Sequence, residues 1–365
     1  MKSYKKIALV LAGGTDLKFW PRSTRENPKQ FVHLFGDMTL FQRTIELLRK
    51  SYDDADIWVV VNEKYMSLVR EQAPDLDHSH IITEPMGRHT AAAVALVVSS
   101  LVRRYEEDTI LTIYPSDHYI QNHEEFRLAI ETASEAAHTL EAIVTIGIKP
   151  TRPETQFGYV QFDDESANFG SAFFEAGLRK SINFAEKPDK FTAQKFIDSG
   201  DFFWNIGILT VRFDVLIKSY EEHLNYYYEQ FKILTQYLNT PEYEEKLTKL
   251  YKTLNKVSLD YGILEDAENV YMLKSTFAWT DLTDWDELFR ISRKDARNNV
   301  MSGNIISIEN NNCVLISEEK TIASIGVENI ILINTEDAIL LCKQGEASRV
   351  QDLVDYMKNR KIPIY

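Results

Sequence analysis

Short apolar runs alternate with helical patterns through the first half of the chain, and this alternation is the strongest constraint on its fold. Apolar runs of strand length recur at 6–12, 56–61, 80–83, 109–118 and 142–148. Segments with a helical spacing of apolar residues lie between them, at 40–50, 63–73, 89–105 and 124–140. Strands that alternate with helices form a mostly parallel sheet with helices on both faces. We therefore expect an α/β, Rossmann-like domain with a mixed, mostly parallel sheet.

The last part of the chain has a different sequence pattern. Residues 299–343 form a series of short β runs separated by Asn, Gly and Asp, with no helical pattern. This predicts a small C-terminal β domain, a short left-handed β-helix, followed by an amphipathic helix that packs back on it. Because no Pro- or Ser-rich linker separates the two parts of the chain, we expect two domains in tight contact, 1–290 and 291–365.

Charge and composition exclude several classes of protein. The formal net charge is −14, which argues against nucleic acid or an anionic membrane surface as a partner. The weakly polar run 90–102 is shorter than the ~20 residues of a membrane-spanning helix. The two cysteines, Cys313 and Cys342, lie outside any CxxC pattern, so we expect no zinc site and a reducing, cytoplasmic setting.

A glycine pair and a basic segment follow the first predicted strand. Neither GxGxxG nor GxxxxGK[ST] is present, so the two commonest phosphate motifs are absent. Gly13 and Gly14 would nevertheless let the backbone approach a ligand. Four cations follow that could contact phosphate oxygens: Lys18, Arg22, Arg25 and Lys29. The alternative interpretation is a tight turn followed by a solvated basic stretch. The segment "PSDH", residues 115–118, also follows a strand directly, where ligands bind in parallel sheets.

Eight segments of the chain resemble the motifs of a known family. Residues 11–31, "LAGGTDLKFWPRSTRENPKQF", are similar to LAGGxGxRLWPLSxxxxPKQF of the mannose-1-phosphate guanylyltransferases, which are sugar-nucleotide pyrophosphorylases. Seven more segments resemble family motifs in the family order: "EPMGRHTAAA", "PSDH", "FGYVQF", "FAEKP", "WNIGIL", "SLDYGILE" and "WTDLTDW". Eight weak motifs in one order make a specific signal that covers about residues 6–345.

The resemblance implies an activity and a set of catalytic residues. Members of the family transfer GMP from GTP to mannose 1-phosphate, giving GDP-mannose and pyrophosphate, by metal-assisted in-line attack on the α-phosphorus. By this resemblance Asp117 and Asp281 would bind Mg²⁺, and Asp284 would cap the helix that follows. The implied catalytic residues are Lys18, Lys29, Asp117, Lys187 and Asp281.

The same resemblance implies two binding sets and a homodimer. Nucleotide-binding residues would be Gly13, Gly14, Thr15, Asp16, Glu84, His89 and Thr90. Sugar-phosphate-binding residues would be Gly158, Glu186, Lys187 and Asn205. The remaining histidines are expected at surface or cap positions, without a catalytic role.

Four residues depart from the family pattern. Asp16 replaces a glycine, and its carboxylate would either repel phosphate or serve as an extra metal ligand. Lys18 replaces an arginine, His89 an asparagine, and Thr283 a glycine where a β-branched residue would poorly tolerate a positive φ. These departures keep two alternatives open: a catalytically silent protein that binds nucleotide or GDP-mannose and regulates a partner, or a nucleotidyltransferase for another base or hexose 1-phosphate.

Overall fold

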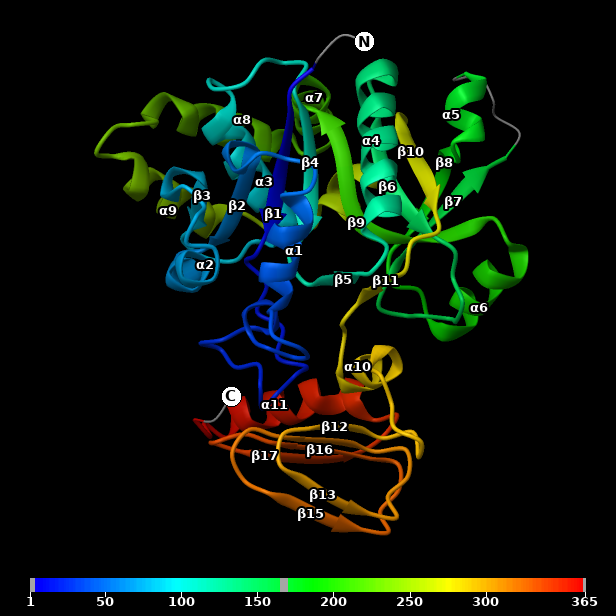
Figure 1. Cartoon of the computed structure of the whole chain (residues 1–365). Helices are drawn as coiled ribbons and strands as arrows, with labels where there is room; N and C mark the ends of the chain where they lie inside the picture. The colour runs from blue at the N-terminus through cyan, green and yellow to red at the C-terminus, as the bar shows by residue number, and fades with distance from the viewer. Residues whose placement is uncertain (1–3, 165–169, 364–365) are drawn as a thin grey trace. The chain divides into compact units, whose positions relative to one another are not determined.

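The chain folds into two compact units. The computed structural model describes residues 4–164 and 170–363. Within them, the first unit contains the chain up to Gly13, Thr44–Ser116 and Ile120–Thr280. The second unit contains Gly14–Arg43, Asp117–Tyr119 and the chain from Asp281 onward. The loop after the first strand therefore belongs to the second unit, together with the C-terminal segment (Figure 1).

A nine-stranded sheet organises the first unit, in the order β3-β2-β1-β4-β9-β6-β10-β8-β7. Its strands are β1 (Lys6–Leu11), β2 (Ile57–Asn62), β3 (Ile81–Glu84), β4 (Ile110–Pro115), β6 (Ile143–Ile148), β7 (Gly158–Asp163), β8 (Leu178–Ala185), β9 (Phe202–Arg212) and β10 (Val270–Ser275). Strands β3, β2, β1 and β4 pair in parallel, as the alternating pattern predicts. Strand β9 runs antiparallel to both of its central neighbours, β4 and β6. The sheet is thus mixed, which confirms the predicted fold class.

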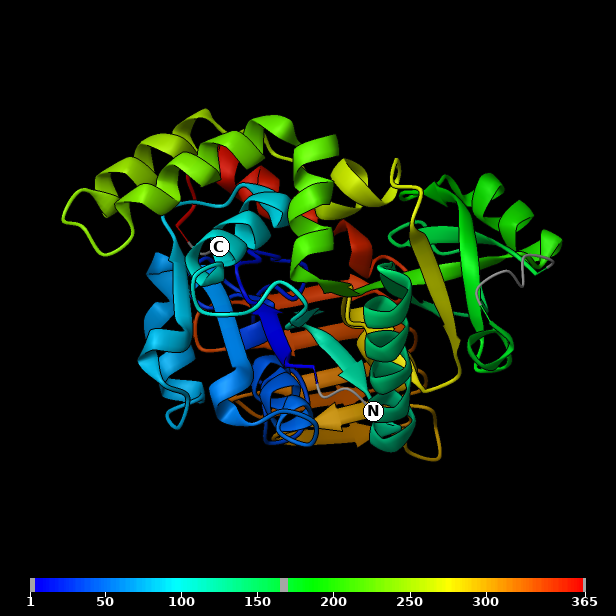
Figure 2. The same cartoon turned by 90° about the horizontal axis from the view of Figure 1, so that it is seen from above.

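Helices cover both faces of this sheet. The helices of this unit are α2 (Met66–Gln72), α3 (His89–Leu101), α4 (His123–Leu140), α5 (Ser171–Glu175), α6 (Lys190–Ser199), α7 (Phe213–His223), α8 (Asn225–Leu234) and α9 (Tyr243–Thr253). The helix before them, α1 (Leu40–Leu48), is divided between the two units. Figure 2 shows α4 on one face and α3 and α7 on the opposite face. Helix α3 is buried on nearly every side because its Ala- and Val-rich sequence packs between the sheet and α8.

One histidine contradicts the expectation that the non-site histidines lie at the surface. His80 is buried, and its ring stacks on Trp58 at 4.1 Å between ring centroids. It ends a short 3-10 helix before β3, where the chain turns into the sheet. His80 follows three polar residues, Asp77, His78 and Ser79, so the sequence gives no signal for its burial.

Parallel strands stack into coils in the second unit. Strands β12 (Val300–Ser302), β14 (Val314–Ser317) and β16 (Ile330–Asn334) pair in parallel, and β13 (Ile305–Ile308) pairs in parallel with β15 (Ile322–Ile325). The last strand, β17 (Ile339–Lys343), returns antiparallel to β16. Gly303 turns one coil at φ +85°, where an added Cβ would lie 1.8 Å from the carbonyl oxygen of Ser317. This is the predicted parallel β-helix; its handedness stays a prediction.

The second unit has its own core, which the loop after β1 helps to build. Leu17, Phe19 and Trp20 of that loop are buried in one cluster with strand residues of the β-helix and with α10 (Trp285–Ile291). The indole N–H of Trp285 donates to the carbonyl of Trp20 at 3.1 Å. Helix α11 (Val350–Asn359) buries its apolar face in the same cluster, which confirms that the terminal helix packs back.

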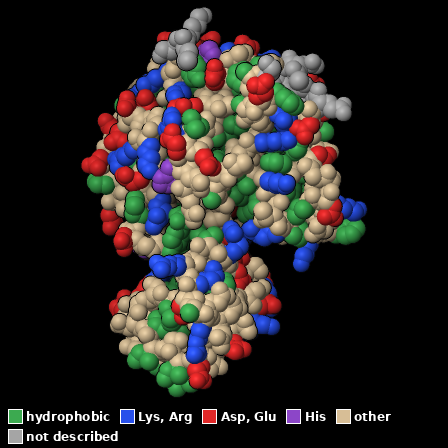
Figure 3. All heavy atoms as spheres, turned by 45° about the vertical axis from the view of Figure 1, so that its right-hand side comes forward, with side chains coloured by type: hydrophobic (Ala, Val, Ile, Leu, Met, Phe, Trp, Pro, Cys, Tyr) green, Lys and Arg blue, Asp and Glu red, His purple; other side chains and the backbone are tan. Residues whose placement is uncertain are grey.

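Apolar side chains remain exposed on the outer strands of the β-helix. Ile306, Ile308 and Ile325, on β13 and β15, are each more than half exposed. Figure 3 shows apolar side chains gathered over this end of the β-helix.

No helix among the described residues is both long and apolar enough to cross a membrane.

Candidate active site

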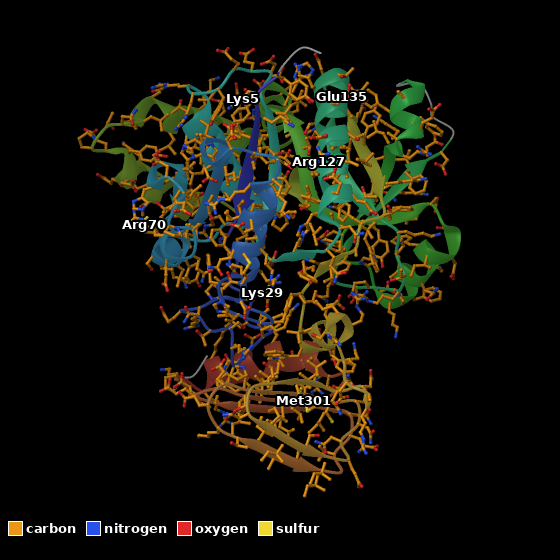
Figure 4. All side chains as sticks on the ribbon, in the orientation of Figure 1. Lys5, Lys29, Arg70, Arg127, Glu135 and Met301 are labelled. Carbon is orange, nitrogen blue, oxygen red and sulfur yellow. The ribbon has the colours of Figure 1, made fainter. Side chains whose placement is uncertain are left out.

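Three aspartates surround one buried lysine in the second unit. The Nζ atom of Lys29 lies 2.9 Å from Asp117 Oδ2, 3.2 Å from Asp281 Oδ1 and 3.7 Å from Asp16 Oδ2. It also donates to the carbonyl oxygen of Leu282 at 3.0 Å. The Lys29 side chain is 5% exposed, and Figure 4 labels it on the segment that follows β1. The structure therefore brings together four residues that the sequence predicted separately.

Short strands bring the two family aspartates together. Asp117 immediately precedes β5 (His118–Ile120), and Asp281 ends β11 (Trp279–Asp281). These two strands form a two-stranded sheet, so residues far apart in the sequence become neighbours. Asp284 accepts a hydrogen bond from the backbone N–H of Glu287 at 3.0 Å and caps α10. The assignment of the helix cap to Asp284 is confirmed, and Asp281 is left to face Lys29.

The charged groups of this cluster shift one another's pKa values. Burial opposes a charge on Lys29, yet Asp117, Asp281 and Asp16 together raise the pKa of Lys29 well above its ordinary value. Burial and the neighbouring Asp117 charge raise the pKa of Asp281 despite Lys29, whereas Lys29 lowers the pKa of Asp117 despite burial. Lys29 thus remains protonated and acts as the internal counter-ion of the two carboxylates.

Asp16 lies in this cluster, facing the other charged groups. One carboxylate oxygen accepts the backbone N–H of Lys18 at 2.9 Å, and the other faces Lys29. The hydrogen bond fixes the turn that a glycine would otherwise make freely. Asp16 has no positive φ, so its side chain causes no backbone strain there.

The donor set fits a hard divalent cation. Side chains of Asp117 and Asp281 are each between a quarter and a third exposed, so a metal could reach them. Among the described residues, no three His, Cys, Asp or Glu side chains are grouped to hold a metal by themselves. Mg²⁺ is commonly bound by one or two carboxylates together with substrate phosphates, so the pair meets that requirement.

A second group of predicted residues gathers in the first unit, where Gly158 begins β7 and pairs with Asn205 of β9, and Glu186 and Lys187 follow β8. The amide of Asn205 accepts a hydrogen bond from Thr145 at 2.5 Å through Oδ1. Glu186 pairs with Lys187 at 3.3 Å. A Cβ on Gly158 would lie 2.9 Å from Glu186 Oε2, so only glycine leaves this carboxylate in place. Lys187 adopts a positive φ of 47°, so the backbone leaves the strand conformation just after β8 ends at Ala185.

Asp260 joins this group although it was not among the predicted site residues. It accepts a hydrogen bond from Asn205 Nδ2 at 2.8 Å. Burial and the charge of Glu186 raise its pKa. Asp260 begins a one-turn π-helix, Asp260–Leu264, a geometry that is frequent at functional sites. The sequence signal was the "SLDYGILE" motif, within which an aspartate before a tyrosine resembles any surface acid.

Predicted nucleotide residues in the first unit lie beside the end of β1. Glu84 ends β3 and is 4% exposed; an added Cβ on Gly13 would lie 3.1 Å from its carboxylate. Burial raises the pKa of Glu84 to about 7, although a hydrogen bond from the Tyr251 hydroxyl at 3.1 Å lowers it. Thr90 uses its hydroxyl to accept the backbone N–H of Leu259 at 2.8 Å. His89 begins α3 with φ 62°, a conformation that His and Asn tolerate better than most residues.

The remaining predicted residues are less constrained. Gly14 and Thr15 are exposed, and an added Cβ on Gly14 would meet no atom within 4 Å. Thr283 is absent from the described residues with positive φ, so the expected strain at this position does not arise. Arg22 makes its contacts within the second unit: it forms an ion pair with Glu318 at 2.9 Å and donates a hydrogen bond to the carbonyl oxygen of His33.

Comparisons with known proteins give the family. Residues 7–298 match the nucleotidyl transferase family, and residues 303–357 match the mannose-phosphate isomerase/GMP-like β-helix domain. Alginate biosynthesis protein AlgA of Pseudomonas aeruginosa is 30% identical, over 97% of this chain and 72% of its own. Mannose-1-phosphate guanylyltransferase RfbM of Salmonella typhimurium is 31% identical, over 96% of this chain and 72% of its own.

A solved structure agrees with these matches. The crystal structure of mannose-1-phosphate geranyltransferase from Thermus thermophilus has a TM-score of 0.85 and 29% identity, and covers 97% of this chain and 99% of that one. Nucleotidyl transferases of this kind generally use a divalent metal ion and act on a nucleoside triphosphate and a sugar phosphate. The match over most of the sequence shows that the chain belongs to the nucleotidyl transferase family.

Proposed function

We propose that this chain transfers GMP from GTP to mannose 1-phosphate, giving GDP-mannose and pyrophosphate. The observation that carries the proposal is the convergence of Asp117 and Asp281 on the buried Lys29. The choice of substrates rests on the guanylyltransferases among the relatives of this chain. The case for a silent protein is weaker, because Asp16 and Thr283 do not have a positive φ and so cause no backbone strain in their loops.

The chemistry needs alignment and charge neutralisation, and no protein nucleophile. A phosphate oxygen of mannose 1-phosphate attacks the α-phosphorus of GTP, a new phosphorus–oxygen bond forms, and the bond to the β-phosphate oxygen breaks to release pyrophosphate. Asp117 and Asp281 would hold Mg²⁺, which when bound neutralises phosphate charge. Lys29 fixes both carboxylates, and Lys18 supplies a cation from the same loop.

The two binding groups have distinct tasks in this proposal. Lys187 binds the sugar phosphate, while Glu186 and Asn205 accept and donate hydrogen bonds to sugar hydroxyls. Gly158 lets the sugar approach the strand backbone. For the nucleotide, the backbone of Gly13, Gly14 and Thr15 contacts phosphate, and Glu84, His89 and Thr90 form the neighbouring wall.

Pyrophosphate release tests the proposal directly. Purified protein is supplied with mannose 1-phosphate and Mg²⁺, and GTP is compared with ATP, UTP, CTP and dTTP. We expect release with GTP and a loss of about a hundredfold or more in Asp117→Asn. Asp108→Asn, at an exposed position in the same unit as β4, is the matched control and should match the parent. Silence with every nucleotide, from protein that still binds GTP, would favour the regulatory alternative and refute this one.

A further inference from the structure

A polar cavity of about 500 Å³ lies in the first unit, and none of the residues that line it belongs to the proposed reaction. Its walls come from β3, from the end of α3 and from the segment that leads into α9. This volume is within the range of small-molecule sites. Hydroxyl and amide groups line much of it, from Thr83, Ser100, Asn239 and Thr240.

Arg104 supplies a positive charge at this cavity. No carboxylate lies within ion-pair distance of its guanidinium among the described parts of the chain. The guanidinium lies 4.7 Å from the ring centroid of Trp58, and one of its nitrogens is 3.2 Å from His80 Nε2. His80 Nδ1 is 3.2 Å from the carbonyl oxygen of Ile57. If Nδ1 donates to that carbonyl, Nε2 accepts from Arg104, and the buried histidine orients the guanidinium.

We propose that this cavity is a second small-molecule site, for a hydroxylated phosphate ester. Among the described residues the guanidinium of Arg104 has one hydrogen-bond partner, His80, and it lies over the ring of Trp58, so further N–H groups remain to match a phosphate. Asn239, Thr240 and the exposed carboxylate of Glu244 line the same cavity and suit hydroxyl groups of the ligand. A purely apolar ligand would leave these groups without partners.

The walls of the cavity also lead to Glu84. Strand β3 contributes Ile81, Ile82 and Thr83 to the cavity and ends at Glu84. On α9, Tyr243 and Leu247 line the cavity, and Tyr251, on the same helical face, donates to Glu84. A ligand that shifts α9 against β3 would therefore change the Tyr251–Glu84 hydrogen bond. This coupling, unlike the binding site itself, rests on the proposed function.

Binding and location are measured together. Calorimetric titrations use glycerol 3-phosphate, inorganic phosphate and glycerate with the full chain, and crystals are soaked in tungstate, whose anomalous signal locates the oxyanion. We expect a tungstate peak within hydrogen-bond distance of Arg104, and about tenfold or more loss of glycerol 3-phosphate affinity in Arg104→Gln. The control is Arg70→Gln, which removes an exposed arginine of α2, labelled in Figure 4, that also has no ion pair with the described residues.

Each outcome decides a separate point. Absence of the peak from the parent protein, or equal affinity in Arg104→Gln and Arg70→Gln, would overturn the site. Glycerate binding as tightly as glycerol 3-phosphate would overturn the phosphate assignment. Both variants should keep parental pyrophosphate release without added ligand, so failure of this site leaves the proposed reaction intact.

Discussion

Glu84 gives the sharpest test of how burial sets charge in this chain. Its pKa rises from 4.5 to about 7 because the side chain is buried, and the Tyr251 hydroxyl offsets only part of this effect. At about 1.4 kcal/mol per pKa unit, the shift corresponds to about 3 kcal/mol of free energy. The folded protein therefore holds a proton on Glu84 that the unfolded chain has already released between these two pKa values.

The sign of the pH dependence follows from the raised pKa. The stabilisation is fully present below about pH 4.5 and is lost as the pH rises through about 7. Glu84→Gln keeps the shape and the acceptor for Tyr251 but has no proton to lose. We expect the stability of Glu84→Gln relative to the parent to increase by about 2–3 kcal/mol between about pH 5 and pH 8.

Urea unfolding at a series of pH values measures this difference. Glu71→Gln, which changes an exposed glutamate on α2, is the matched control and should follow the parent at every pH. A difference between Glu84→Gln and the parent that stays constant with pH would refute the argument, since Glu84 would then titrate alike in both states. Tyr251→Phe should enlarge the parental loss of stability with rising pH and extend it to higher pH, because it removes the hydrogen bond that lowers the pKa of Glu84.

Three further substitutions test local geometry. His89→Val should cost about 1–2 kcal/mol of stability in thermal unfolding, and His89→Asn almost nothing, because the residue has φ 62°; equal losses would contradict this. Asn205→Ala should raise KM for mannose 1-phosphate and lower stability by about 1–3 kcal/mol, since Asp260 would lose the hydrogen bond from Asn205; an unchanged KM would remove Asn205 from the sugar site. Asp16→Gly should lower turnover about two- to fivefold, because its partly exposed contact with Lys29 stabilises the cluster; a rise in turnover would show that the carboxylate repels phosphate.

Much of the fold could be predicted from local patterns. The alternation of strands and helices gave the parallel half of the sheet, and the run of short strands gave the β-helix. The position of β9 between β4 and β6 was beyond these patterns, because periodicity carries no information on the order of strands. The place of the loop after β1 could not be predicted either, because it depends on a contact between residues far apart in the sequence. Trp20 packs with Trp285, 265 positions away.

The sequence indicated most of the candidate site by resemblance and little of it by chemistry. Asp117 and Asp281 were selected by motif, while their shared contact with Lys29 depends on strand pairing that no local signal reveals. Asp260 was missed because an aspartate in a helical segment is common, and its raised pKa arises only once Glu186 lies nearby. Arg104 was missed for the opposite reason, since what marks it is that no carboxylate of the described residues lies within ion-pair distance of its guanidinium.

The net charge of the acidic cluster bears on how an acidic chain can bind a triphosphate. Three carboxylates and one ammonium, from Asp16, Asp117, Asp281 and Lys29, leave the cluster with an excess of two negative charges. A bare triphosphate would be repelled by this excess, and a divalent cation would neutralise it. With glycine in place of Asp16, the excess would be a single charge. We therefore expect nucleotide binding by this chain to depend more strongly on the divalent cation than binding by Asp16→Gly, which equilibrium titration with GTP in Mg²⁺ and in chelator would measure.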